Sequence, residues 1–384
     1  MKMHFNWLDL FKAPRLAIST GKRLIIQTTG LLAGYAGYLI LTYLAWLFAG
    51  QSVGQTWDNF GLFPVWGFGF DSWISALFWW LGIAFFLFTS LWFSTAVAKV
   101  TYEELKGDQF YSAKESLSFI KGRFSSVISS PLTLFFLFAF LVIVGALIGL
   151  VGRIPAFGEL FFALIFGIPV FVVAVFGVLV GLVFFSSLIL TPAVVGTLKS
   201  DTFTTVLEYF QTVWNQPGRF FGYAGINLIF AKVGIFVMGY FFMRAFEMIH
   251  WACGSTMGDK LDRIFDAAWG YLPPGEITGF FTTLYPGSSI GYGFPFSLGA
   301  TDLGFTGTLA AFLMGITLVA VFFLLLGYGL TVFTCGQTIG YIITYKHREN
   351  ENLLDRKNEE EPAPFKEVEG RIKEKTEPQR RVVE

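Results

Sequence analysis

Residues 169–190 read PVFVVAVFGVLVGLVFFSSLIL and contain no charged side chain. A helix needs about 20 predominantly apolar residues to cross the hydrocarbon core of a bilayer, and this stretch meets that length. Five other segments do the same: Leu24–Ala49, Trp73–Val100, Leu132–Val151, Phe221–Met243 and Leu309–Gly340. The sequence therefore predicts an all-α integral membrane protein with six transmembrane helices.

The composition of the whole chain agrees with this class. Of its 384 residues, 54% are hydrophobic and only 14% are charged, values that lie outside the range of soluble globular proteins. Of the 27 basic and 27 acidic residues, Lys346–Glu384 hold 10 and 11, so this end of the chain is nearly neutral. A balanced tail is not a polybasic arm, and the sequence predicts no nucleic acid partner.

Three parts follow from these patterns: an N-terminal interfacial helix (1–23), a six-helix transmembrane domain (24–348) and a charged cytoplasmic tail (349–384). The tail carries Pro362-Ala363-Pro364 and has too few apolar residues for a core, so we expect it to be disordered apart from a helix over Phe365–Lys375. In the first part, Phe5, Trp7 and Phe11 recur at helical spacing before Pro14, which predicts a short helix lying in the membrane interface.

Lys and Arg are unevenly placed among the short loops. The N-terminal part and the segment after the second span are rich in them, whereas the loop Gly50–Ser72 has none. Because Lys and Arg concentrate on the cytoplasmic side, both termini are predicted to be cytoplasmic. The two loops on the other side, Gly50–Ser72 and Trp251–Asp302, are rich in glycine and aromatic residues, and we expect them to fold back onto the membrane surface. Short loops without sorting motifs indicate a multi-pass protein of a bacterial inner membrane.

One pattern occurs twice on the cytoplasmic side. Its first copy comprises Thr95-Ala96-Val97, Asp108-x-Phe110-x4-Glu115 and Gly122-Arg123-Phe124. Its second copy comprises Thr191-Pro192-Ala193-Val194, Asp201-x-Phe203-x4-Glu208 and Gly218-Arg219-Phe220. The duplication predicts two parallel repeated hairpins joined by amphipathic interfacial helices. The last span and the N-terminal helix could together form a third unit, split between the two ends of the chain.

The repeated charged residues have two interpretations. Asp108 and Asp201 precede helical patterns, where an acid is a good N-cap, and Arg123 and Arg219 precede spans, where a cation anchors to lipid phosphates. Alternatively, the group Asp108, Glu115, Arg123, Asp201, Glu208 and Arg219 forms a cytoplasmic interface for a partner or a lipid headgroup. Residues seven apart lie on one face of a helix, which allows the second interpretation.

Lys232 is the one charge that falls in the interior of a predicted span, since Lys99 lies one residue from the end of its own. Burying it there without a partner costs at least about 2.5–3.5 kcal/mol, which makes it a candidate functional residue. Alternatively the span moves to about 233–253 and Lys232 reaches the cytoplasmic interface. That shift buries Arg244, Glu247 and His250 towards the outer side, where Arg244 and Glu247 are three apart and can pair.

Glycine and proline suggest how the spans pack. Gly30, Gly34 and Gly37, and likewise Gly145, Gly149 and Gly152, form small-residue stripes that allow close approach of another helix. Pro169 and Pro192 are predicted to end their span. Leu309–Gly340 is too long for one straight crossing at about 1.5 Å per residue. It either projects into the cytoplasm or breaks near Gly327-Tyr328-Gly329.

Enzyme signatures are weak. The G-x-S-x-G pattern of a nucleophile elbow occurs around Ser52 and Ser289, but neither has the strand-to-helix context that a catalytic serine needs. Two cysteines, which are too far apart on the predicted topology to bridge, and three histidines at the ends of spans argue against a zinc or haem site. We therefore expect no cofactor and no enzymatic activity.

The interrupted hairpins and the final Gly340-Tyr341-Ile342-Ile343-Thr344-Tyr345-Lys346 resemble uncharacterised bacterial polytopic inner-membrane proteins. They are also similar in style to the membrane domain found ahead of some glycerophosphodiester phosphodiesterases, although no phosphodiesterase domain is present. The resemblance implies a location and a fold but no catalytic residue.

Three functions remain open. The first is a structural or accessory subunit of a membrane assembly, whose partners are the lipid bilayer, other membrane subunits and a cytoplasmic protein bound by the tail. The second is a transporter or channel for a small or lipid-like solute, with Lys232 in the path. The third is an intramembrane lipid-modifying enzyme, which requires Arg244, Glu247 and His250 to converge with acids of the outer loop, or His250 to meet Ser52 or Ser289.

Overall fold

The computed structural model describes residues 3–64, 70–155, 157–272 and 303–356, which contain helices and no strand. Six helices are long and apolar enough to span a membrane, as the sequence predicts. They are α2 (Lys22–Phe48), α4 (Trp73–Lys106), α6 (Phe124–Gly152), α8 (Gly167–Leu198), α10 (Pro217–Met257) and α13 (Gly304–Glu349). The chain is therefore a helical, multi-pass membrane protein.

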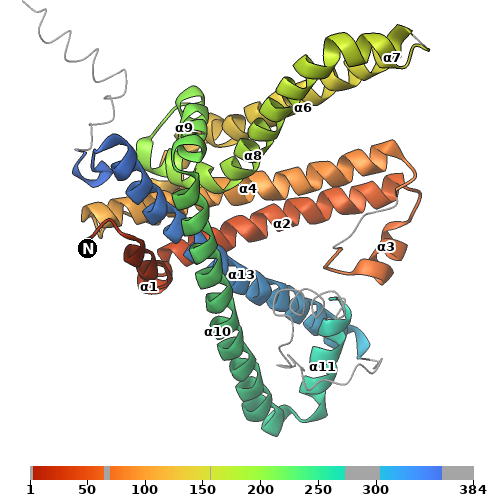
Figure 1. The fold of residues 1–384 in the computed structure, drawn as a ribbon. Coiled ribbons are helices and arrows are strands. Elements are labelled where there is room, and N and C mark those ends of the chain that lie inside the picture. The colour runs from red at the N-terminus through yellow and green to blue at the C-terminus, as the bar shows by residue number, and fades with distance from the viewer. Residues whose placement is uncertain (1–2, 65–69, 156, 273–302, 357–384) are drawn as a thin grey trace, which may run out of the picture.

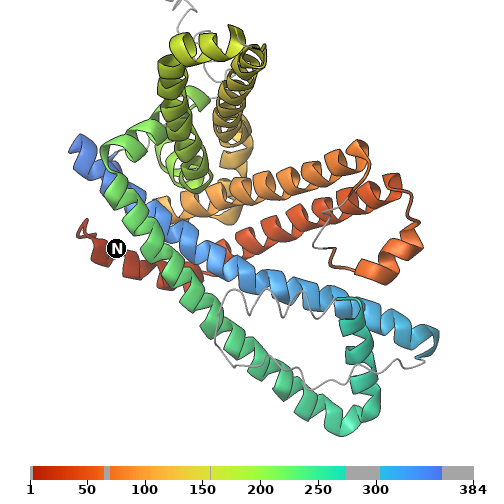
Figure 2. The same cartoon turned by 45° about the vertical axis from the view of Figure 1, so that its right-hand side comes forward.

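The long helices form three hairpins, α2–α4, α6–α8 and α10–α13, which meet at one end and diverge towards the other (Figure 1). We call the common end, where α1 (Ala13–Ser19) and the last turns of α13 lie, the base, and the opposite end the far end. Figure 2 shows the same divergence after rotation, so the separation of the hairpins is not an effect of one view.

Short helices lie at both ends. The base holds the 3-10 helix η1 (Trp7–Lys12), α1, α5 (Ala113–Gly122), α9 (Thr202–Asn215) and the 3-10 helix η3 (Leu353–Asp355). The far end holds α3 (Val53–Phe60), α7 (Phe157–Phe161), the π-helix η2 (Phe162–Phe166) and α11 (Asp259–Gly270). Pro14 does not end the N-terminal helical segment. It stands in the first turn of α1, where a proline is tolerated because its missing N–H would have no helical partner.

One expected interruption of a long helix is wrong, and a second, which was one of two alternatives, does not occur. Helix α8 continues past Pro192 to Leu198, and every residue of Leu190–Thr197 is buried, so tertiary contacts outweigh the lost hydrogen bond. Helix α13 is unbroken at Gly327-Tyr328-Gly329. A Cβ at Gly327 would lie 2.5 Å from Thr28 Oγ1 of α2, and one at Gly329 would lie 2.4 Å from Ile235 Cδ1 of α10. These glycines serve close packing, and α13 continues without a break to Glu349.

The core of the protein lies at the base, around α13. All residues of Thr334–Tyr345 are buried, because α2, α4, α8, α10 and α1 surround this segment. By contrast, α6 has no buried residue after Leu134, and α8 has none before Gly177. About two-thirds of α6 and one-third of α8, at the far end of this hairpin, thus contain no buried residue.

The two predicted glycine stripes have different environments. Gly30, Gly34 and Gly37 lie against Phe93, Phe86 and Phe85 of α4, which confirms close helix approach for the first stripe. For the second stripe the prediction is wrong: no heavy atom lies within 4 Å of a Cβ built at Gly145 or Gly149, and Gly152 contacts only Phe162. The stripe faces outward because α6 stands apart from the other hairpins.

Candidate functional site

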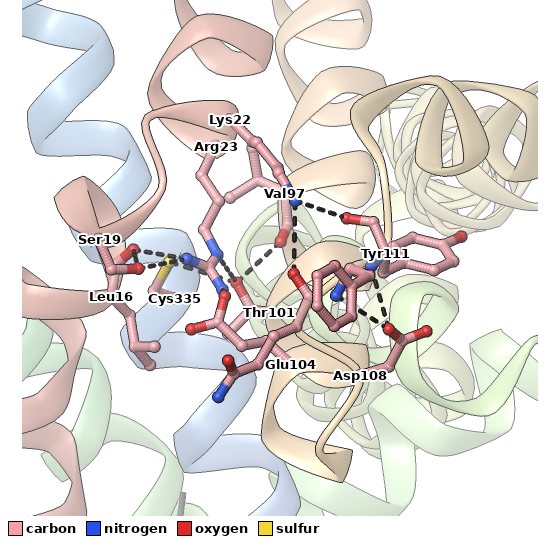
Figure 3. A network of polar contacts seen from close by, with 12 residues as sticks. Leu16, Ser19, Lys22, Arg23, Val97, Thr101, Glu104, Asp108, Tyr111 and Cys335 are labelled. Atoms are coloured by element: carbon pink, nitrogen blue, oxygen red, sulfur yellow. Dashed lines mark hydrogen bonds and ion pairs between the residues drawn. The ribbon is translucent and has the colours of Figure 1, made fainter.

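The most concentrated group of polar side chains lies inside the base, centred on Arg23 at the start of α2. The Arg23 side chain is fully buried. Its Nη1 donates to the Leu16 carbonyl (2.6 Å), its Nη2 to Glu104 Oε2 (2.5 Å) and its Nε to Thr101 Oγ1 (3.1 Å). Figure 3 shows that these partners come from α1 and α4, with Cys335 of α13 behind them. A buried guanidinium is tolerated only when its donors are satisfied in this way.

The same network holds the first linker, which is the segment that joins α4 to α6 and contains α5. Lys22 Nζ donates to the carbonyls of Gln109 (3.4 Å) and Tyr111 (3.2 Å), between α4 and α5 (Figure 3). Asp108 Oδ1 accepts from the backbone N–H of Phe110 (3.0 Å) and of Tyr111 (3.1 Å). Asp108 is therefore not the N-cap of α5. It holds a turn before the helix, and the cap is Ser112.

A second buried charge lies beside the first. Lys99 and Glu103 form an ion pair one turn apart on α4, and both side chains are almost completely buried. The Lys99 Nζ lies 4.9 Å from the ring centroid of Phe119 and 5.3 Å from that of Tyr102, so aromatic faces complete its surroundings. In the sequence, Arg23 closes the basic N-terminal part and Lys99 is one residue from the end of a predicted span, and no local signal marks either as buried.

The duplicated acids have different roles in the two linkers. Glu115 completes a capping box with Ser112, and the hydrogen bonds from Ser112 lower the pKa of its carboxyl group. Asp201 is the N-cap of α9, as predicted, and hydrogen bonds from Thr204 lower its pKa. Glu208 instead pairs across the base with α13: its Oε2 accepts from Arg348 Nη2 (2.7 Å) and from the Tyr341 hydroxyl (2.8 Å). The equivalent acids of the two sequence copies therefore have different local partners.

The two repeated arginines lie at the starts of α6 and α10. Arg123 links α5 to α6 and is half-buried, while Arg219 is exposed and donates from Nη1 to Gln216 Oε1 (3.1 Å). Both are placed where an interface anchor is expected, at the basal ends of membrane-spanning helices.

Lys232 lies on the exposed surface of α10, not among the residues packed around α13. Its neighbour Ala231 contacts Gly329 of α13. Gly329 is six residues, or about 9 Å of helix rise, further from the base than Cys335, which contacts Thr101 in the Arg23 network. Lys232 is thus within about two turns of the buried charges, a position that favours the interfacial interpretation.

The three candidate residues near the far end of α10, Arg244, Glu247 and His250, form two separate pairs. Arg244 Nη1 lies 2.5 Å from Glu247 Oε2, as their spacing predicts, and both side chains are about half exposed. His250 Nδ1 lies 3.2 Å from Asp262 Oδ1 of α11. Burial and the nearby Asp262 raise the pKa of Asp266, one turn further along α11. No cluster of three or more metal-ligating side chains occurs among the described residues.

The candidate serine Ser52 is the N-cap of α3, where it forms a capping box with Gln55. The second candidate, Ser289, lies outside the described residues. Both cysteines are free thiols: Cys253 is exposed and Cys335 is buried.

The structure also contains a feature that sequence analysis missed, a turn over Gly61–Pro64 that re-enters the space between two hairpins. Its carbonyls at Gly61, Leu62 and Pro64 accept hydrogen bonds from the hydroxyls of Tyr43 (2.5 Å), Tyr35 (2.7 Å) and Tyr38 (2.9 Å) of α2, respectively. Tyr35 lies thirteen residues, or about 20 Å of helix, before the end of α2. Irregular backbone at membrane depth requires such partners, because no water is available there.

The turn joins the α2–α4 hairpin to the α10–α13 hairpin. The Leu62 amide donates to the Tyr271 carbonyl at the end of α11 (2.9 Å), and the rings of Phe63 and Phe322 lie 5.5 Å apart. Tyrosines at 35, 38 and 43 facing a Gly-Leu-Phe-Pro segment were the available signal in the sequence. The α6–α8 hairpin has no corresponding connection in the described residues.

Gly61 is the position at which this turn is most sensitive to substitution. Its φ is +52°, and an added Cβ would lie 2.4 Å from the Tyr271 carbonyl oxygen. We expect Gly61→Ala to increase hydrogen exchange in both residues 57–64 and residues 271–272, measured by mass spectrometry. Gly50→Ala is the matched control, because Gly50 also has a positive φ (+88°) but nothing within 4 Å. Equal exchange in the two variants would contradict the contact.

Comparison with protein-family models, with curated proteins and with solved structures finds no match to this chain.

Proposed function

We propose that this protein is a non-enzymatic structural or accessory subunit that organises a membrane assembly. The observation that carries the proposal is the α6–α8 hairpin. Over its outer part it buries nothing against the other hairpins, and its surface is made of Leu, Val, Ile, Phe and the uncovered glycines Gly145 and Gly149. Small residues allow a helix from another subunit to approach closely, and such contacts drive helix association in membranes.

The rigid base supports this proposal. Buried ion pairs and hydrogen bonds hold α1, α2, α4, α9 and α13 in one arrangement, so hairpins that diverge from it are presented in fixed directions. We further propose that α4–α5–α6 and α8–α9–α10 are parallel repeats, that the base is cytoplasmic and that the membrane is a bacterial inner membrane. The order of the elements and the basic residues at the base support these proposals.

The C-terminal tail is the proposed docking segment for a cytoplasmic partner. Residues 350–356, which sequence analysis placed in the tail, lie against the base: Leu353 is fully buried and its carbonyl accepts from the Tyr102 hydroxyl (2.7 Å). Residues 357–384 lie outside the described residues. A truncation that tests the tail should therefore begin after Arg356, so that the anchored segment is kept.

The test of this proposal is a pull-down from mild detergent with the full chain and with a variant lacking residues 357–384. We expect the truncated protein to lose soluble partners but to keep membrane-embedded ones, because those bind the hairpins. Identical co-purification by the two proteins would contradict the role of the tail.

A transporter or channel for a small or lipid-like solute is the second candidate. The re-entrant turn over Gly61–Pro64 favours it, since non-helical backbone at membrane depth occurs at transport pathways. In proteoliposomes, Lys232→Met would then abolish flux and Lys232→Arg would retain it. Equal flux in both variants would remove Lys232 from this proposal.

His250 meets one acid of the outer loop, Asp262, but Arg244 and Glu247 form a separate exposed pair and the Ser52 hydroxyl caps α3, which gives the lipid-modifying enzyme less support. General acid–base catalysis requires its groups within about 3 Å of the reacting atoms.

A further inference from the structure

Helix α9 is tethered at both ends to helices of the membrane domain. It begins four residues after the end of α8 and ends two residues before the start of α10. In Figure 1 it runs across the general direction of α4 and α8. One of its faces is buried against α6 and α8, where the Tyr209 hydroxyl bonds to Ser130 Oγ (3.0 Å) and Thr191 Oγ1 (2.6 Å).

The opposite face of α9 is apolar. Phe203, Leu207, Phe210 and Trp214 recur at intervals of four, three and four residues, which places them on one side of the helix. Phe203 is 70% exposed, Leu207 44% and Trp214 69%. Phe210 is half-buried against the core of the base, whereas Phe203, Leu207 and Trp214 stay exposed among the described residues.

The charges around the stripe match a membrane interface. Glu208 is paired with Arg348, and the Asp201 carboxylate caps the helix, so neither acid faces outward without a partner. Lys199 and Arg219 flank the two ends of α9. An apolar face bordered by cations and containing a tryptophan is typical of a helix lying between headgroups and acyl chains.

The corresponding helix of the first linker has the opposite character. The exposed positions of α5 are Lys114, Glu115, Ser118, Lys121 and Gly122, and none carries an apolar side chain. Its apolar residues Leu117, Phe119 and Ile120 face the core of the base. A lipid-immersed α5 would therefore have to desolvate charged groups, whereas α9 would not.

We propose that the two linker helices bind different phases: α9 inserts its exposed residues Phe203, Leu207 and Trp214, with the half-buried Phe210 beside them, into the boundary between headgroups and acyl chains of the adjacent leaflet, while α5 faces water. The exposed Phe110 precedes α5 and is not part of this helix. This assignment holds whether the protein is a scaffold or a transporter. It predicts that residues of α9, and not those of α5, contact the acyl chains of the lipids.

Site-directed fluorescence tests the proposal in vesicles. In a Cys253→Ser background, where the remaining Cys335 is buried, bimane is attached at Leu207→Cys or Phe203→Cys on α9 and at Ser118→Cys on α5. The vesicles contain phosphatidylcholine with or without brominated acyl chains, and iodide is added as the aqueous quencher. Unchanged elution and melting temperature show that each labelled protein is folded.

The α9 labels should lose fluorescence in brominated lipid and resist iodide, and the α5 label should show the reverse. Iodide quenching of both α9 labels to the level of Ser118→Cys would overturn the proposal. Protection of the α9 labels from both quenchers would also overturn it, because a protein partner or a second copy of the chain would then cover the stripe.

Discussion

Replacing Arg23 with methionine is expected to lower the free energy of unfolding by about 3–5 kcal/mol, because it leaves the Glu104 carboxylate, and with it the Leu16 carbonyl, without the buried partner. The measurement is equilibrium unfolding in detergent or nanodiscs. Arg15→Met on α1 is the matched control, since Arg15 is exposed and belongs to the same basic N-terminal segment. The control should change the free energy by no more than about 0.5 kcal/mol.

A double variant distinguishes the loss of the Arg23–Glu104 ion pair from a general disruption of the base. The double replacement Arg23→Met with Glu104→Met removes both charges, so it should be more stable than Arg23→Met alone. If the double variant loses as much as the sum of the two single variants, the two residues do not interact, and the network does not hold α1 and α2 to α4 as described.

The second large effect is expected at Gly336, in the contact between α13 and α10. A Cβ there would lie 2.2 Å from Asn227 Oδ1, and Asn227 is fully buried with neither amide atom hydrogen-bonded. Gly336→Val should therefore force α10 away from α13 and cost about 1–3 kcal/mol or more. Thermal unfolding in the same detergent provides the measurement.

Gly145→Val on α6 is the control for this substitution. It makes the same change in helix propensity at a position with nothing within 4 Å of the added Cβ. In the purified chain it should leave stability nearly unchanged. A combination of Gly336→Ala with Asn227→Ala should recover most of the loss of Gly336→Ala alone, and failure to recover it would place the strain elsewhere.

The sequence was sufficient for those parts of the fold that depend on hydrophobic length. Runs such as residues 169–190 predict each long helix, since few other structures satisfy an apolar segment of that size in a membrane. The ends of the helices were harder to predict from the sequence. Pro192 reads as a terminus, yet α8 continues because Leu190–Thr197 is buried against other helices, a fact that no local pattern contains.

The polar site was only partly predictable. Asp201 was identified as a cap because caps depend on neighbouring residues, and the Arg244–Glu247 pair followed from helix spacing. The burial of Arg23 could not be foreseen, because its partners Thr101 and Glu104 are about 80 residues away. The re-entrant turn at Gly61 was missed for a similar reason: the tyrosines of the preceding helix and the Gly-Leu-Phe-Pro segment are visible in the sequence, but their contacts with each other and with Tyr271 are not.

Native mass spectrometry of the protein extracted directly from its membrane tests the central proposal most directly. If the chain is an accessory subunit, it should be found with defined membrane-protein partners, and Gly145→Leu with Gly149→Leu on the uncovered face of α6 should release them while the variant remains folded. Recovery of the intact chain with lipids alone, together with solute flux that depends on Lys232, would contradict the account.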